Sequence, residues 1–390
     1  MTQRQPLRIG IIAAEPSADL LAAGLMDALR HRLPQVSFEG IAGPLMRQSG
    51  IDVWEDMDSI SVMGLVEVVP HLRRLLQLRA RILQRWRDTP PAAFIGVDAP
   101  DFNLTVEMRL REQGVPTVHY VSPTVWVWRT GRVRKMRRAI DLLLTIFPFE
   151  GEFLQRYGMH ATYVGHPLAW EMPLDPDKDA ALRAFDLDPS RPVLAVLPGS
   201  RRGEVSRIAP AFVETAQRLQ AEIPGLQVVL PLINATTRDM LETIRAAHAP
   251  GLECTVSVGD ARVAMAAADV VLVASGTATL ECLLSKRPMV VGYKVSPATY
   301  RIVRLFRLLK VKHVALSNLL AGEGLAPELI QDACTPDRLA PALKTFFDDA
   351  DTRAHIAGRY RQIHEGMRMD TNSVAADAVI ALLKERGLVS

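Results

Sequence analysis

Short apolar runs alternate along this chain with longer segments whose apolar positions recur at helical spacing. The apolar runs predict buried strands at residues 7–14, 37–42, 92–97, 117–121 and 142–146, and again at 193–197, 227–230, 255–258, 270–274 and 289–291. Runs without polar alternation are typical of parallel strands that are covered on both faces. Strands separated by helical segments therefore predict an α/β fold built on parallel sheets.

The strand pattern stops and then starts again, which indicates two domains. Residues 1–170 and 193–350 each carry a Rossmann-like pattern, and residues 171–192, rich in Asp and Pro, are predicted to be a linker. Residues 351–390 are predicted to form C-terminal helices that pack back across the domains or are swapped in a dimer. A chain of 390 residues is long enough for two cores of ordinary size.

Composition narrows the class of protein. Three cysteines without a CxxC pair favour neither a zinc site nor a disulfide framework, so we expect a reducing, cytoplasmic environment. The polar first residues give no sign of a signal peptide, and no apolar run approaches the roughly 20 residues that span a membrane. We therefore expect a soluble or peripheral protein.

The residues that follow the predicted strands differ between the two halves. Ligands of open parallel sheets bind beyond the carboxyl ends of the strands. The first half places the carboxylates of Glu15 and Asp98 there, which suits removal of a proton from a hydroxyl. The second half places glycines, hydroxyls and Arg201 there, which suits a diphosphate. Because the two halves differ in this way, we expect one half to bind a donor nucleotide and the other to bind the acceptor of the transferred group.

The segment from Ser275 to Glu281 is the strongest candidate for a phosphate site. It follows an apolar strand, and its small residues open a helix whose first N–H groups are unsatisfied. Glu281 lies one turn after Thr277, within reach of sugar hydroxyls beside such a phosphate. The alternative is an ordinary strand–turn–helix joint in which Ser275 or Thr277 is the N-cap.

Asp98 and Arg201 also have plainer explanations. Asp98 can cap the turn after its strand, and Glu15 is the rival general base. Arg201 can be a surface arginine, although Gly199 beside it favours a ligand loop.

Motifs for cofactors and metals are absent from the sequence. No G-x-G-x-x-G follows a strand, and the loop 199–203 lacks the spacing of an NTPase phosphate loop. The D-x-D at residues 56–58 has no apolar strand before it, so we interpret it as a solvated loop. The histidines form no H-x-x-x-H pair, and we expect neither a metal nor a cofactor.

One stretch carries more apolar residues than a single helix face can bury. Residues 62–69 are almost wholly apolar, and apolar residues alternate with arginines after them. Such a surface suits interfacial contact with an anionic membrane, to which further basic clusters at 129–138 and 301–312 add. We expect no nucleic acid, because stacking aromatics do not accompany the charge. The expected membrane contacts are Val62, Met63, Leu65, Val66, Val68, Val69, Leu72, Arg73, Leu75 and Leu76.

Several motifs in order resemble those of the lipid A disaccharide synthases, a family of bacterial glycosyltransferases. The likeness runs nearly from end to end. The matching segments are 14–19 (AEPSAD), 97–103 (VDAPDFN), 120–129 (YVSPTVWVWR), 164–168 (VGHPL), 197–201 (LPGSR), 275–281 (SGTATLE) and 318–320 (NLL).

The resemblance implies a GT-B fold, with two Rossmann-like domains whose parallel sheets face a central cleft. It implies that residues 1–170 bind the acceptor and face the membrane, and that residues 193–350 bind the UDP-sugar. It also implies an inverting, metal-independent enzyme that is cytoplasmic and peripheral at the inner membrane, where it contacts anionic phospholipid of the inner leaflet. A homodimer that exchanges the helices of 351–390 is a further implication.

The family's substrates would be UDP-2,3-diacylglucosamine as donor and 2,3-diacylglucosamine 1-phosphate as acceptor, which give a β-1,6-linked disaccharide 1-phosphate and UDP. Asp98 matches the proposed base, and Arg201 and Asn318 match residues thought essential. The residues expected at the UDP-sugar are Ser17, Gly199, Ser200, Arg201, Ser275, Gly276, Thr277, Ala278, Thr279, Glu281 and Tyr293.

Two other functions stay open at this point. The first is another UDP-sugar enzyme of the same fold, such as a 2-epimerase or a transferase to a soluble acceptor. Such a function does not explain the apolar-basic surface. A catalytically inert peripheral membrane protein leaves Asp98, Arg201 and Glu281 unexplained at strand ends.

Overall fold

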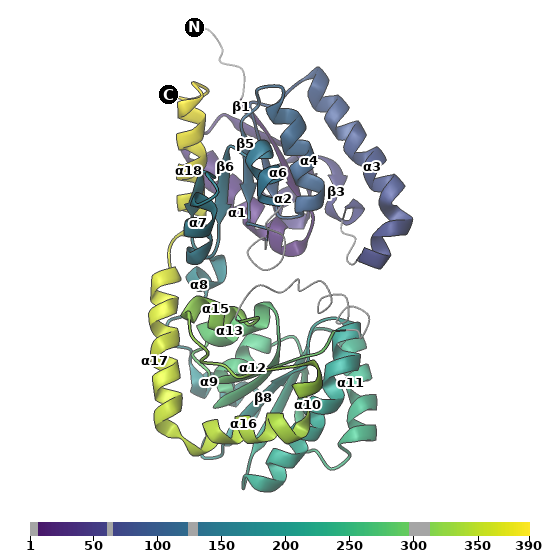
Figure 1. Ribbon diagram of the computed structural model, residues 1–390, viewed down its shortest axis with the longest axis vertical. Coiled ribbons are helices and arrows are strands. Elements are labelled where there is room, and N and C mark those ends of the chain that lie inside the picture. The colour runs from purple at the N-terminus through teal and green to yellow at the C-terminus, as the bar shows by residue number, and fades with distance from the viewer. Residues whose placement is uncertain (1–6, 61–64, 124–131, 296–312) are drawn as a thin grey trace. The chain divides into compact units, whose positions relative to one another are not determined.

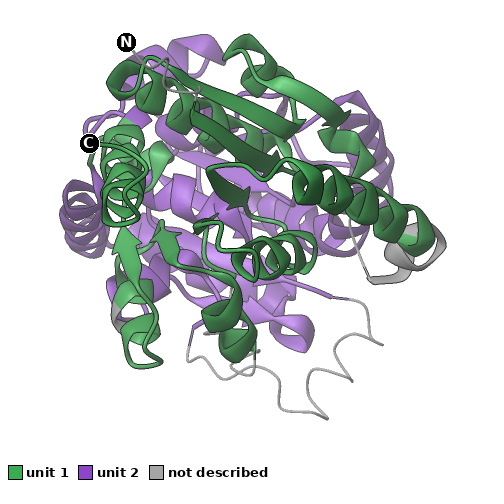
Figure 2. Ribbon diagram, turned by 90° about the horizontal axis from the view of Figure 1, so that it is seen from above, with its two compact units in different colours: residues 1–170, 369–390 green, residues 171–368 purple. Residues whose placement is uncertain are grey.

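The computed structural model describes residues 7–60, 65–123, 132–295 and 313–390. The chain divides into two compact units, which we call unit 1 (residues 1–170 and 369–390) and unit 2 (residues 171–368). Figure 2 colours them separately. Each is an α/β unit with one parallel sheet, as the hydrophobic pattern predicts.

Unit 1 is built on a seven-stranded sheet in the order β3-β2-β1-β4-β5-β6-β7. Figure 1 labels β1, β3, β5 and β6 of this sheet. Its strands are β1 (Leu7–Ala13), β2 (Val36–Ala42), β3 (Asp52–Asp56), β4 (Ala93–Val97), β5 (Thr117–Tyr120), β6 (Leu142–Thr145) and β7 (Ala161–Tyr163). Its helices are α1 (Pro16–Arg32), α2 (Pro44–Gln48), α3 (Leu65–Asp88), α4 (Pro100–Arg111), α6 (Arg132–Ala139), α7 (Pro148–Gln155) and α18 (Thr371–Glu385), while α8 (Pro167–Glu171) crosses the boundary to unit 2.

Unit 2 repeats the design with a six-stranded sheet in the order β10-β9-β8-β11-β12-β13. Its strands are β8 (Val193–Leu197), β9 (Gln227–Leu232), β10 (Thr255–Val258), β11 (Val270–Ala274), β12 (Met289–Tyr293) and β13 (Glu328–Ile330). Its helices are α9 (Lys178–Ala184), α10 (Arg202–Glu222), α11 (Ala235–His248), α12 (Ala261–Ala267), α13 (Thr277–Leu284), α15 (Leu316–Ala321), α16 (Pro336–Asp348) and α17 (Ala350–Met367).

Two segments, residues 171–192 and the C-terminal helices, are assigned to the compact units by their contacts. Residues 171–192, predicted to be a linker, belong to unit 2, because Lys178 of α9 pairs with Asp269 and α9 packs on α12. The C-terminal helices separate: α17 stays in unit 2, whereas α18 packs on α1 of unit 1. There Arg32 Nε donates to Asp377 Oδ1 at 2.8 Å.

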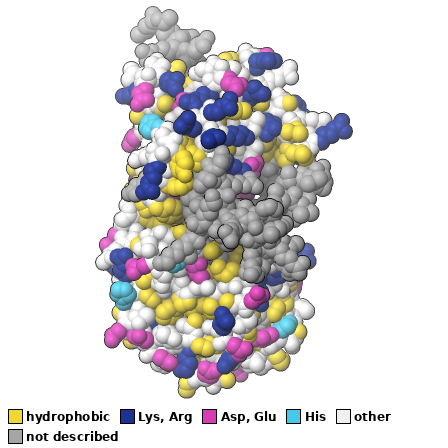
Figure 3. Space-filling view, viewed as in Figure 1, with side chains coloured by type: hydrophobic (Ala, Val, Ile, Leu, Met, Phe, Trp, Pro, Cys, Tyr) yellow, Lys and Arg dark blue, Asp and Glu magenta, His cyan; other side chains and the backbone are white. Residues whose placement is uncertain are grey.

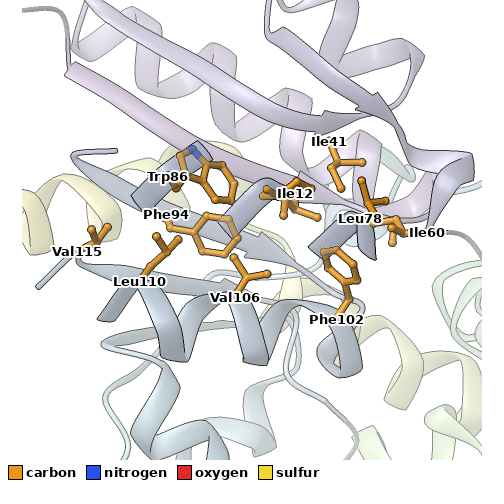
Figure 4. Packing of buried hydrophobic residues seen from close by; sticks show 12 residues of the cluster. Ile12, Ile41, Ile60, Leu78, Trp86, Phe94, Phe102, Val106, Leu110 and Val115 are labelled. Atoms are coloured by element: carbon orange, nitrogen blue, oxygen red, sulfur yellow. The ribbon is translucent and has the colours of Figure 1, made fainter. Parts of the chain in front are cut away.

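The largest buried side chain of unit 1 anchors its core. Trp86 of α3 is fully buried, with its ring 5.2 Å from that of Phe94 on β4. Figure 4 shows these rings beside Ile12, among the side chains that α3 and α4 press against the sheet. The indole Nε1 donates to Glu39 Oε1 at 2.9 Å, so the buried polar atom has a partner.

Asp19 ties α1 to α2 through a buried carboxylate. It is 2% exposed and accepts hydrogen bonds from the backbone N–H groups of Gly43, Leu45 and Met46 at 2.9–3.1 Å. These bonds satisfy the donors at the start of α2. This last residue of the AEPSAD motif is therefore structural.

We expect Asp19→Ala to lower the free energy of unfolding of unit 1 by about 3 kcal/mol or more, because it leaves buried N–H donors without partners. All five tryptophans belong to unit 1, so tryptophan fluorescence during urea unfolding reports this unit. The control is Asp27→Ala on the exposed side of α1. Equal midpoints for the two variants would show that the Asp19 bonds contribute nothing.

Candidate functional site

A cleft of about 750 Å³ opens at the carboxyl edge of the unit 2 sheet. It lies where β8 and β11 are neighbours although distant in sequence, which is the switch point at which open α/β sheets bind ligands. The lining residues are Leu197, Gly199, Ser200, Arg201, Glu204, Pro231, Leu232, Ile233, Gly259, Asp260, Ala261, Arg262, Ala274, Ser275, Gly276, Thr277, Ala278, Glu281 and Tyr293. Nine of the residues predicted to bind the UDP-sugar are among them, and the structure brings them together from β8, β11 and β12.

Two helices begin at this cleft, and their first turns differ. The backbone N–H groups before α10 are already bonded within the protein. Glu204 Oε2 accepts hydrogen bonds from the N–H groups of Ser200 and Arg201 at 3.2 and 3.3 Å. The first turn of α13 has no side-chain cap. Its N-cap Gly276 has φ +150°, a conformation that only glycine adopts readily. The open N–H groups of α13 are therefore the better anion site.

Arg201 supplies positive charge to the cleft. Its side chain is exposed, and within the part of the chain that the structure describes its guanidinium forms no hydrogen bond or ion pair. It is thus available to an anionic ligand. Tyr293 lies on the same wall, and burial raises the pKa of its hydroxyl, which stays a neutral donor.

Arg262 is a site residue that sequence reasoning missed. Its Nε donates to Glu281 Oε1 at 2.9 Å, and both side chains line the cleft. The ion pair fixes the Glu281 carboxylate one turn into α13. The signal was in the sequence: Arg262 follows the predicted strand 255–258, whose carboxyl end belongs to the same edge.

Two residues predicted at the UDP-sugar, Ser17 and Thr279, do not line this cleft, and neither does Asn318, which was predicted to be catalytic. Thr279 is fully buried, and its hydroxyl donates a hydrogen bond to the carbonyl of Gly276. It therefore stabilises the first turn of α13 and does not face the cleft. Asn318 is 1% exposed, and its amide bonds Ala326 and Glu328 at 2.7–2.8 Å, which holds α15 against the loop before β13. Ser17 is exposed in the first turn of α1, in unit 1.

Asp98 marks the corresponding switch point of unit 1. It follows β4, which pairs with β1 so that Val97 lies opposite Ala13, two residues before Glu15. The Asp98 carboxylate is half-buried and bonds none of the described side chains or backbone groups. Asp98 and Ala99 have φ values of 53° and 44°, a left-handed conformation that residues other than glycine rarely adopt. Such strain at a strand end is typical of functional sites.

The predicted membrane surface is described only in part. Val62 and Met63 lie outside the described residues; Leu65, Val66, Val68 and Val69 belong to α3, but their side chains are not described. Leu72 and Leu76 are 47% and 46% exposed, with Arg73 exposed beside them. Leu75 instead packs partly buried against the unit 1 core, so it contributes less to this surface than predicted.

Basic side chains gather on the face of unit 1 seen in Figure 3. On α6, Arg134, Lys135, Arg137 and Arg138 are exposed while Val133, Met136 and Ala139 are buried. The second basic cluster, 301–312, lies outside the described residues. None of the described helices is long and apolar enough to cross a membrane.

The D-x-D at residues 56–58 has a structural role. Asp56 accepts from the N–H of Asp58 and pairs with Arg47, at 2.9 and 2.8 Å. No cluster of three or more His, Cys, Asp or Glu side chains suited to a metal occurs among the described residues.

Comparison with known sequences finds relatives along nearly the whole chain. The family model described as lipid-A-disaccharide synthetase matches residues 9–381. A lipid-A-disaccharide synthase of Klebsiella pneumoniae subsp. pneumoniae is 46% identical over 385 residues, which cover 99% of this chain and 100% of the relative. One of Xanthomonas campestris pv. campestris is 48% identical over 382 residues, 98% of this chain and 87% of the relative.

Solved structures share the fold at low identity. A UDP-GlcNAc 2-epimerase from Neisseria meningitidis, bound to UDP-GlcNAc, has a TM-score of 0.60 at 9% identity and covers 97% of this chain and 99% of its own. CalG4, the calicheamicin glycosyltransferase, has a TM-score of 0.58 at 16% identity and covers 98% and 99%. These similarities show the fold alone, which is GT-B, and epimerases and transferases share it.

Proposed function

Since the chain belongs to the lipid-A-disaccharide synthase family of glycosyltransferases, we propose that it transfers 2,3-diacylglucosamine from UDP-2,3-diacylglucosamine to 2,3-diacylglucosamine 1-phosphate. The products are the β-1,6-linked disaccharide 1-phosphate and UDP, with inversion at the anomeric carbon. The observation that supports this most directly is the unit 2 cleft, where Arg201, whose guanidinium has no bonded partner among the described residues, lies near the uncapped start of α13.

The cleft suits the leaving diphosphate. Arg201 and the first N–H groups of α13 place positive charge where the diphosphate gains negative charge as the glycosidic bond breaks. A charge-assisted arginine contact contributes about 1.5–3 kcal/mol, against about 0.3–1 kcal/mol for an exposed helix dipole, so Arg201 is the larger contributor. Glu281, held by Arg262, accepts hydrogen bonds from the ribose hydroxyls.

Asp98 is the proposed general base. Its carboxylate takes the proton of the acceptor's 6-hydroxyl as that oxygen attacks the anomeric carbon and the bond to the diphosphate breaks. The fixed backbone at the end of β4 orients the carboxylate, and the absence of a competing partner among the described residues leaves it available to a hydroxyl. Asn318, whose amide is used inside unit 2, acts by holding α15 in place.

The test is UDP release by purified protein in detergent with the diacylated donor. We expect release to require the acylated acceptor and to be lost when the acceptor lacks its acyl chains. Release without acceptor, together with a free 2-epimer, would favour the epimerase alternative and overturn the proposal. Release with a soluble acceptor alone would favour a different transferase.

We also propose peripheral docking on anionic phospholipid through the start of α3. Replacing Leu72 and Leu76 with serine should weaken binding to vesicles containing phosphatidylglycerol by about tenfold or more, because exposed leucines lose their burial in the acyl layer. Activity in detergent should stay within about twofold. The control is Leu388→Ser, an exposed leucine after α18. Unchanged vesicle binding by the double variant would remove α3 from the contact.

A homodimer that exchanges C-terminal helices remains a proposal. Each subunit would lend its α18 to the partner's α1, along the contact that α1 and α18 make within one chain here.

A further inference from the structure

The turn that carries Asp98 is held at both of its backbone groups. The Asp98 N–H donates to the Tyr120 carbonyl on β5 at 2.8 Å. Its carbonyl accepts from Asn103 Nδ2 at 2.8 Å. Two consecutive left-handed residues persist only where the surroundings fix them, and these two bonds do so from opposite sides.

Packing alone does not explain why a polar asparagine occupies position 103. The side chain is fully buried on α4, and its Oδ1 has no hydrogen-bond partner in the described structure. A leucine, which has the same number of side-chain heavy atoms in the same branching pattern, would avoid the cost of burying that acceptor. The buried acceptor therefore costs stability, and what the amide supplies in return is the short bond from Nδ2 to the Asp98 carbonyl and a longer one, 3.4 Å, to the carbonyl of Val97 just before it.

A buried ionisable pair lies one helical turn beyond Asn103. Glu107, one helical turn further along α4, is fully buried and its Oε1 lies 2.6 Å from Nδ1 of the fully buried His119 on β5. Burial raises the pKa of Glu107. The two side chains are thus bonded to each other inside the sheet–helix layer and do not face solvent.

Gly96 makes room for this arrangement. It lies opposite His119 in the β4–β5 register, two residues before Asp98. A Cβ at Gly96 would come within 2.3 Å of Glu107 Oε1 and 2.9 Å of Asn103 Cβ. Because real Cβ atoms do not approach so closely, the missing side chain lets Glu107 and Asn103 pack together against the strand.

We propose that Asn103 is a positioning residue for the Asp98 carboxylate, held in place by Gly96 and the Glu107–His119 pair. It does not touch substrate; it fixes the backbone from which Asp98 reaches the acceptor hydroxyl. This inference rests on the proposed function of Asp98 and extends it to the buried residues that pack behind the Asp98 turn.

The experiment compares Asn103→Leu with Val106→Ala, a buried residue of the same helix that makes no bond to the Asp98 turn. We expect Asn103→Leu to lower kcat about 10- to 100-fold, since small misplacement of a catalytic group has effects of that size. KM for both substrates should change less than threefold, and Tm should be equal to or above that of the unchanged protein. Val106→Ala should lower Tm but keep kcat within twofold.

Normal kcat in a folded Asn103→Leu protein would overturn the inference, as would an equal loss of kcat in Val106→Ala. If Asn103→Leu does not fold, Asn103→Ala is judged by the same split between kcat and KM. The Asp98→Asn/Asn103→Leu double variant should be no slower than Asp98→Asn alone, because Asn103 acts only through Asp98.

Failure of the proposed function has a different signature. Turnover retained by Asp98→Asn itself removes the base assignment whatever Asn103→Leu does. Loss of turnover in Asp98→Asn with normal turnover in Asn103→Leu overturns only the positioning role.

Discussion

Asp98→Asn is expected to lose turnover by about 10²- to 10⁴-fold while it keeps its fold and its affinity for UDP. The asparagine has nearly the same shape but cannot accept a proton from the acceptor hydroxyl. Its backbone bonds to Tyr120 and Asn103 do not involve the carboxylate, so the turn should survive the change. Steady-state kinetics with both acylated substrates measure the loss, and a calorimetric titration with UDP checks the donor site.

Glu15→Gln is the matched control, because Glu15 lies beyond the neighbouring strand end in the same unit. A large loss in Asp98→Asn and a small one in Glu15→Gln would support the assignment. The reverse order would transfer the role of base to Glu15.

Arg201→Ala is expected to weaken UDP binding about 10- to 100-fold, with a parallel rise in KM for the donor. The estimate follows from about 1.5–3 kcal/mol for a charge-assisted contact to the diphosphate. No hydrogen bond or ion pair engages the Arg201 guanidinium in the described residues, so its removal should leave unit 2 intact.

Arg202→Ala tests whether the effect is specific. Arg202 is the next residue and equally basic, but it does not line the cleft. Titration calorimetry with UDP should give near-unchanged affinity for Arg202→Ala. Equal losses in the two variants would mean that general positive charge, rather than a contact by Arg201, attracts the nucleotide.

The central strands could be predicted because each is uniformly apolar. All five residues of β4, β8 and β11 are buried. β8 and β11 form the switch point of unit 2, and β4 forms that of unit 1 together with β1. The edge strands β3, β7 and β13 were missed, since they are short and only partly buried. Their polar sequences, such as that of Asp52–Asp56, look like loops until neighbouring strands supply their hydrogen bonds.

The donor cleft could be predicted at the level of strand ends but not of single side chains. Thr277 and Thr279 are two positions apart, yet the first lines the cleft and the second is buried in the core. Which of them faces the cleft depends on where the helix begins, at Gly276, and the sequence does not specify that position. Asn318 belongs to a matching motif, yet its amide binds backbone inside unit 2. Arg262 contacts Glu281 from α12, a tertiary contact that sequence spacing does not specify.

The direct test of the central claim is the structure of the product formed from UDP-2,3-diacylglucosamine and 2,3-diacylglucosamine 1-phosphate. We expect NMR of the isolated glycolipid to show a single new glycosidic bond with β configuration to the 6-oxygen of the acceptor, formed in equal amount to the UDP released. An α-linked product would contradict inversion, and UDP release without any disaccharide would contradict the assignment of the chain as this transferase.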